Sequence, residues 1–240
     1  MNNIEFFENH EFSYLEDFES PYTFNGIPVP RATHILSTML NEEYIARWAN
    51  SLGFKHKGYK TTLDEAAEKG TLIHDSINRY IVKGEQPFQY ISSIPDQYIE
   101  STLNGFNSFI NWYNSVYGIE ILYSELPLSC PYYGGTADLI ARYNNKTYLL
   151  DFKTGKHLSF RYFLQLSAYR YILENYNNIK IDGLGIIRLD KDIVAYKDYI
   201  LELDNETNLN YINQCTETFF ALVNAYRYRY NNEYLYKSIF

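Results

Sequence analysis

The stretch of sequence that decides the fold spans residues 134–154 and reads GGTADLIARYNNKTYLLDFKT. Residues 134–143 and 146–154 are rich in aliphatic and aromatic side chains, and Asn144 and Asn145 stand between them. Asparagine tolerates the left-handed backbone conformation that a two-residue hairpin loop requires. We therefore predict two antiparallel strands joined by a tight turn.

The segments on either side of this hairpin extend the sheet and indicate the fold class. Residues 119–128 have the composition of a further strand. Downstream, a helix is predicted over residues 159–176, and two more strands are predicted over 181–189 and 194–203. A strand, helix and strand succession after antiparallel strands favours a mixed sheet. The predicted fold class is α/β (α+β), with a mixed central β-sheet flanked by helices.

The remaining segments are predicted to be mainly helical. Thr62 and Glu65 fit a capping box at the start of a helix that stops at Gly84. The sequence around Asn25 and Gly26 has hairpin character. Further helices are predicted over residues 37–52, 95–117 and 208–230.

Length and composition indicate a globular chain. The chain has 240 residues, of which 46% are hydrophobic, and this suits one sizeable domain. We predict an acidic N-terminal segment over residues 1–20 and a single domain over 21–240, with a core at about 62–203. No apolar stretch is long enough to span a bilayer and no secretory signal is visible, so we expect a cytoplasmic protein without a membrane partner.

The net charge of -8 argues at first against a nucleic-acid partner, but its distribution does not. Residues 1–20 hold six acids and no lysine or arginine. Residues 44–63 and 152–173 each hold four lysine or arginine residues and no acid. These two basic windows are either solvated faces or surfaces for a polyanion.

The second basic window begins beside a group of carboxylates. Strand alternation places Asp151 and Lys153 on one face, and the preceding strand carries Asp138. Two neighbouring carboxylates repel one another unless a cation or a shared proton intervenes. Magnesium prefers such oxygen ligands. The alternative for Asp151 and Lys153 alone is a salt bridge on an edge strand.

Four sequence blocks, in order over about 100 residues, carry a family resemblance. They are GTLIH at 70–74 followed by Tyr80, GTAD at 135–138, DFKTG at 151–155 and QLSAY at 165–169. Together they resemble the PD-(D/E)XK nucleases, in particular the RecB-like exonuclease branch. The resemblance implies a restriction-endonuclease-like core with an N-terminal helical extension.

The resemblance also implies roles for individual residues. Asp138 and Asp151 are implied as metal-binding carboxylates and Lys153 as the catalytic lysine, with Glu125 as an additional catalytic acid. His74 and the backbone carbonyl of Phe152 are implied as further metal ligands. The residues expected to line the site or to contact nucleic acid are Gln165, Tyr169, Thr154, Lys156 and Arg161; Gln165 and Tyr169 alternatively steady Lys153.

The expected activity is that of a DNA nuclease dependent on Mg²⁺ or Mn²⁺, and the family resemblance implies an exonuclease. Cys130 and Cys215 are too few to hold an iron-sulfur cluster. The DNA strandedness stays open, and a protein partner for targeting or strand separation is compatible with the absence of an ATPase phosphate loop. Two alternatives are a non-cleaving nucleic-acid or protein binding module on the same fold, and a metal-dependent hydrolase of small phosphoesters.

Overall fold

A mixed five-stranded sheet forms the centre of the computed structural model, which describes residues 20–40 and 59–239. Its strands lie in sequence order: β3 (Glu120–Ser129), β4 (Gly134–Tyr143), β5 (Lys146–Lys153), β6 (Gly183–Leu189) and β7 (Tyr196–Glu202). Only β5 and β6 pair in parallel, and a helix connects them. Asn144 and Asn145 have φ values of 51° and 59°, so the predicted tight turn is confirmed.

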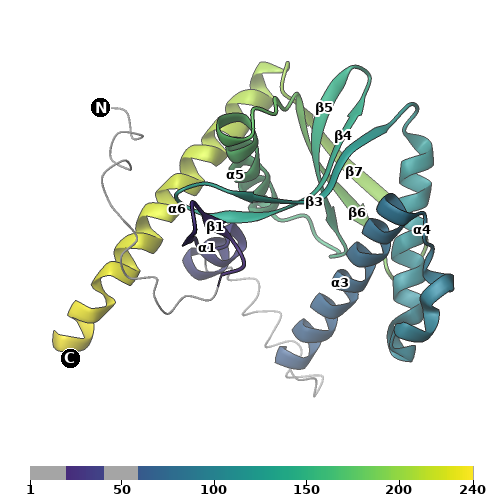
Figure 1. The fold of residues 1–240 in the computed structure, drawn as a ribbon, viewed down its shortest axis with the longest axis horizontal. Coiled ribbons are helices and arrows are strands. Elements are labelled where there is room, and N and C mark those ends of the chain that lie inside the picture. Colours follow the sequence, from purple (N-terminus) through teal and green to yellow (C-terminus); the bar gives the residue numbers. More distant parts are fainter. Residues whose placement is uncertain (1–19, 41–58, 240) are drawn as a thin grey trace.

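Helices cover both faces of the sheet (Figure 1). One face carries α3 (Tyr59–Lys83) and α4 (Ile99–Ser115), together with the short 3₁₀ helices η1 (Pro87–Ser93) and η2 (Asp96–Tyr98). The other face carries α1 (Ala32–Met39), α5 (Phe160–Tyr176) and the long α6 (Glu206–Ile239). A small hairpin of β1 (Thr23–Phe24) and β2 (Ile27–Pro28) precedes α1, as the sequence around Asn25 predicts. The predicted fold class is confirmed.

Alternating side chains of the strands separate two hydrophobic cores. Leu149 packs with α1, α5 and α6, whereas Leu150 and Phe152 pack with α3 and α4. The first face therefore also carries Asp151, whose position in β5 follows Leu149 by two residues. This alternation is the one predicted from the sequence.

Several predicted helix bounds differ from the structure. The helix predicted over 37–52 begins at Ala32, and residues 41–58 lie outside the described part of the chain. The capping box at Thr62 is wrong, because α3 is already helical at Tyr59. The α4 helix begins at Ile99, and α6 continues to Ile239. In the ranges described here, no helix combines the length and the apolar character needed to cross a membrane.

Candidate metal and catalytic site

The two predicted metal-binding carboxylates lie on neighbouring strands, at the carboxyl end of β5. The register of β4 and β5 pairs Leu139 with Leu150. The next residues along this register are Asp138 and Asp151, so they lie opposite one another on the same sheet face. The backbone N–H of Phe152 donates to Asp138 Oδ2 at 2.8 Å, which ties the Asp138 carboxylate to β5. The predicted proximity of the two acids is confirmed.

Asp151 is the most buried acid of the site. Its side chain is 3% exposed, and Lys153 Nζ lies 2.9 Å from Oδ1 and 2.7 Å from Oδ2. Gln165 Nε2 donates to the same Oδ1 at 3.1 Å. Within the described ranges, no group is placed in hydrogen-bonding geometry to Oδ2, although the Lys153 ammonium is at ion-pair distance. A buried carboxylate attracts a cationic group, and in this structure that group is the Lys153 ammonium.

Lys153 is held between an acid and an aromatic ring. Its ammonium contacts Asp151 on one side and lies 5.0 Å from the ring centroid of Tyr162 on the other. Such contacts restrict a side chain that is otherwise flexible. The Lys153 side chain is 22% exposed, so its ammonium remains partly open to solvent beside the carboxylates.

His74 reaches the site from α3. Its Nε2 lies 3.1 Å from the backbone oxygen of Phe152, and because a carbonyl only accepts, Nε2 donates in this contact. Its Nδ1 lies 3.5 Å from Asp138 Oδ2 and 3.8 Å from Glu125 Oε1. Two of the predicted ligands, His74 and the Phe152 carbonyl, thus hydrogen-bond to each other through Nε2, and Nδ1 is the atom that faces the carboxylates.

Glu125 adopts an unusual backbone conformation inside β3. Its φ is 50°, although Ser124 and Leu126 on either side keep a regular register with β4. A left-handed residue other than glycine costs about 1–2 kcal/mol and clusters at functional sites. This conformation accompanies a carboxylate placed beside His74, and no feature of the sequence predicts it.

A pair of substitutions at Glu125 separates this backbone cost from the loss of the carboxylate. Glu125→Gly and Glu125→Ala both remove the carboxylate, but only glycine adopts the left-handed conformation freely. We expect the free energy of unfolding of the glycine variant to be about 1 kcal/mol higher than that of the alanine variant. Urea denaturation in EDTA measures this difference, and equal stabilities would show that Glu125 is not strained.

Three side chains form a group that can hold a divalent cation. One ligand atom each from His74, Glu125 and Asp138 lie within 4.8 Å of one another. An open cavity of about 550 Å³ is lined by His74 and Glu125. This set of oxygen and imidazole donors, with the Asp151 carboxylate nearby, fits Mg²⁺ or Mn²⁺. Glu125, expected only as an additional acid, belongs to the central group.

Mutual charges shift three pKa values in the site. Burial opposes protonation of His74, yet the Asp138 charge and the Glu125 contact raise its pKa to about 9. Burial raises the pKa of Asp151 to about 6, against the opposing charge of Lys153. Burial also disfavours the charged form of Lys153, but Asp151 and Asp138 raise its pKa overall. Two cations of the chain itself therefore balance the carboxylates.

The raised pKa of His74 predicts a pH-dependent stability of the metal-free protein. A group whose pKa rises from 6.5 to about 9 on folding stabilises the fold fully below pH 6.5 and loses this effect as the pH passes 9. We expect the free energy of unfolding in EDTA to fall by roughly 2–3 kcal/mol between about pH 6.5 and pH 9.5. Urea titrations measure it, and an equal fall in a His74→Gln variant would refute the assignment.

Gln165 and Tyr169 lie beneath the carboxylates instead of on the surface. They are 8% and 3% exposed, and their predicted contact with nucleic acid stays a prediction. Gln165 lines the site as predicted and positions Asp151. A Cβ atom at Gly135 would collide with the Tyr169 ring, so the glycine makes room for this tyrosine. Burial raises the pKa of Tyr169, and the Asp151 and Asp138 charges raise it further.

The predicted basic residues have different positions. The Arg161 guanidinium donates to the backbone oxygens of Leu36 and Leu40 at the end of α1. This contact gives Arg161 a structural role, and its predicted contact with nucleic acid stays a prediction. Lys156 is 72% exposed and pairs with Asp192 at 2.8 Å, so it stays on the surface near the site.

Thr154 lies between the end of β5 and α3. Its Oγ1 would be 3.5 Å from a Cβ atom at Gly70, which is an ordinary van der Waals distance. A glycine inside a helix suggests that another backbone segment packs closely against it. At Gly70 the structure shows no such segment among the residues that it describes. The tolerance of this helical glycine has no explanation in the contacts of the structure.

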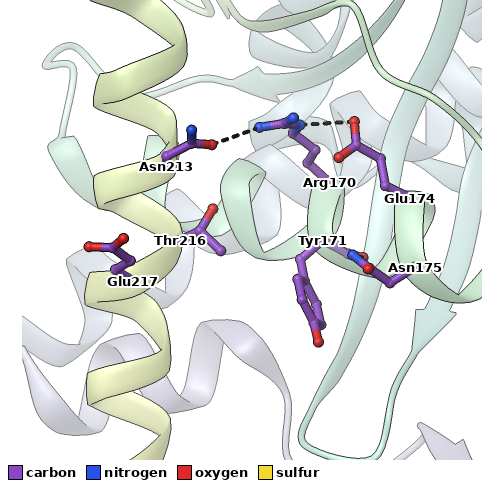
Figure 2. Close-up of a pocket in the computed structure, with 7 residues that line it drawn as sticks. All are labelled: Arg170, Tyr171, Glu174, Asn175, Asn213, Thr216 and Glu217. Atoms are coloured by element: carbon purple, nitrogen blue, oxygen red, sulfur yellow. Dashed lines mark hydrogen bonds and ion pairs between the residues drawn. The ribbon is translucent and has the colours of Figure 1, made fainter. Parts of the chain in front are cut away.

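A second cavity, of about 320 Å³, lies between α5 and α6 (Figure 2). In Figure 2, Arg170 points to Glu174 and Asn213, with contacts of 3.0 Å and 3.4 Å. The cavity thus contains an arginine whose charge is already paired. Arg170 comes from the basic window at 152–173, and its side chain pairs within this cavity between α5 and α6.

Comparison with known proteins leaves the chain without a family assignment. No family model matches it, and no curated protein matches it. Matching solved structures include the crystal structure of SSO0001, with 16% sequence identity and a TM-score of 0.28. That match covers 64% of this chain and 74% of the other.

Proposed function

We propose that this protein is a metal-dependent DNA nuclease of the PD-(D/E)XK type, with an exonucleolytic action like that of the RecB-like branch. One observation carries the proposal. Asp138, Asp151 and Lys153 meet at the carboxyl end of β5, where His74 and Glu125 join them. Three acids, an imidazole and an ammonium at one place are suited to phosphodiester hydrolysis.

The metal ligands in this proposal are drawn from the acids and the imidazole. Glu125 and Asp138 would hold the ion with Asp151 Oδ2, and His74 would join them as its proton leaves. A bound Mg²⁺ or Mn²⁺ supplies polarisation of the phosphate and a lowered pKa of a coordinated water. The raised pKa of His74 makes metal binding favourable at higher pH, since the ion competes with a proton there.

The side chains of the protein perform the remaining tasks. The Lys153 ammonium, fixed by Asp151 and Tyr162, donates to the attacking water or to a non-bridging phosphate oxygen as negative charge develops. Gln165 keeps the Asp151 carboxylate oriented through its 3.1 Å hydrogen bond. The exposed part of Lys153 is the side from which a phosphate approaches.

A cleavage assay tests this function against its alternatives. Labelled single-stranded and duplex DNA are incubated with Mg²⁺ or with EDTA, in parallel with a nucleotide monoester. Metal-dependent shortening of DNA supports the proposal. If the protein binds DNA but forms no cleavage products with any metal ion, a non-cleaving module is favoured. If it hydrolyses the monoester and leaves DNA intact, a hydrolase of small phosphoesters is favoured.

A further inference from the structure

A group of lysines lies beside the candidate metal site, at the carboxyl ends of the parallel strands β5 and β6. Lys156 follows β5, Lys191 follows β6 and Lys69 lies on α3. Ligands of open sheets with parallel strands bind at this edge. None of the three lysines belongs to the metal site, so the metal does not explain why they lie close together.

Contacts between four elements bring these lysines together. Lys156 pairs with Asp192 in the turn between β6 and β7, at 2.8 Å. Asn104 of α4 donates to the backbone oxygens of Lys191 and Asp192, at 3.4 Å and 3.2 Å. Lys69 of α3 lies 5.5 Å from the ring centroid of Tyr98, immediately before α4.

Arg188 extends the same group from within β6. Its Nη1 donates to the backbone oxygen of Lys156 at 3.2 Å, and its Nη2 lies 3.9 Å from Asp190. The turn that carries Lys191 is therefore fixed from two sides, by Arg188 and by Asn104. A fixed turn loses little conformational entropy when a ligand binds.

The lysines are incompletely neutralised. Asp192 interacts with Lys156, Lys191 and Lys69 together, and its pKa is lowered by the Lys156 hydrogen bond and by all three charges. The pKa of Lys191 is lowered, first by burial and then by repulsion from Lys69. Two carboxylates, Asp190 and Asp192, thus face three ammonium groups and the Arg188 guanidinium, and this excess of positive charge favours binding of a further anion.

The other side of the metal site differs in charge. The cavity of about 550 Å³ beside His74 is lined by the carboxylates of Asp75, which pairs with Arg79 at 2.7 Å, and of Glu125; within the described ranges neither lysine nor arginine lines it. A polyanion that leaves the metal site therefore meets carboxylates in one direction and ammonium groups in the other.

We propose that Lys69, Lys156 and Lys191 form a patch that binds the DNA backbone beside the cleaved phosphate, so that the bound strand runs across the carboxyl ends of β5 and β6. This inference rests on the proposed nuclease function and names the surface that receives the substrate. The lysines of this patch are positioning residues, because they contact phosphates that do not react.

Binding of a labelled 20-residue oligothymidylate in Ca²⁺ tests the patch, with fluorescence anisotropy recorded over a series of salt concentrations. Each lysine that contacts a phosphate of a single strand releases about 0.7 counterion. At 0.1 M salt this release strengthens binding about fivefold relative to 1 M salt. We expect Lys156→Gln and Lys191→Gln each to weaken binding about fivefold. The triple variant with Lys69→Gln should weaken it by about a hundredfold and lower the salt slope by about two.

Lys180→Gln is the matched control, because Lys180 is also exposed and pairs with an aspartate at 2.8 Å, at the opposite end of β6. It should leave affinity and salt slope unchanged, and thermal melting checks that all variants fold. If wild-type protein binds the oligonucleotide and the triple variant binds equally well, the patch is refuted and the nuclease proposal stands. If wild-type protein neither binds nor cleaves DNA, both proposals fail.

Discussion

A Lys153→Met variant is expected to lose about a thousandfold in the rate of DNA cleavage. Methionine fills a similar volume but offers no ammonium to the water or the phosphate oxygen. The variant should still bind DNA in Ca²⁺, because the ammonium of Lys153 acts mainly as charge develops. Single-turnover cleavage of labelled DNA in Mg²⁺ measures the rate.

The same variant has a second signature, in stability. Lys153 opposes the rise in the pKa of Asp151 that burial causes. Without Lys153 this pKa rises further, so ionising the buried Asp151 costs more. The free energy of unfolding in EDTA, which falls as the pH rises above about 4, should therefore keep falling to a higher pH than in the wild type. Lys197→Met is the matched control, because Lys197 also lies 5.0 Å from a tyrosine ring centroid. Cleavage unchanged by Lys153→Met would remove Lys153 from the mechanism.

An Asp138→Asn variant is expected to lose metal binding more than about a hundredfold, and cleavage with it. Asparagine keeps an oxygen that accepts the N–H of Phe152, so the strand pairing at this point is retained. The negative charge is removed, and with it the foremost contribution that raises the pKa of His74. Mn²⁺ titration followed by calorimetry measures the affinity.

Two further readouts keep the Asp138 result interpretable. The pKa of His74, followed by NMR in EDTA, should move down toward 6.5, which a general loss of structure would not produce. Asp198→Asn on β7 serves as the control, since Asp198 is exposed and lies outside the metal site. Mn²⁺ affinity equal to that of the wild type would exclude Asp138 as a ligand.

The architecture follows from local patterns, but its helix bounds do not. The stretch 134–154 predicts the β4–β5 hairpin, because alternation and two asparagines at the turn are local properties. The starts of α1 and α3 differ from the predictions, since α1 begins before residue 37 and α3 begins before the capping box at Thr62. Tertiary packing extends a helix past a local signal when its apolar face is buried.

The site could be predicted in part. The proximity of Asp138 to Asp151 follows from the hairpin register, and the Gln165 side chain lies at the site as the QLSAY block suggests. The left-handed conformation of Glu125 could not be predicted, because its residue type does not favour it and the His74 that it approaches lies on another element. The role of Arg161 was also missed, since α1 lies far from it in sequence.

The rate of DNA cleavage as a function of Mg²⁺ concentration tests the central claim most directly. With one labelled DNA and the full chain, the account predicts no product in EDTA, a saturable rise with Mg²⁺, and a shift of this curve to higher Mg²⁺ in Asp138→Asn. Product formation in EDTA, or intact DNA at saturating Mg²⁺ and Mn²⁺, would contradict it.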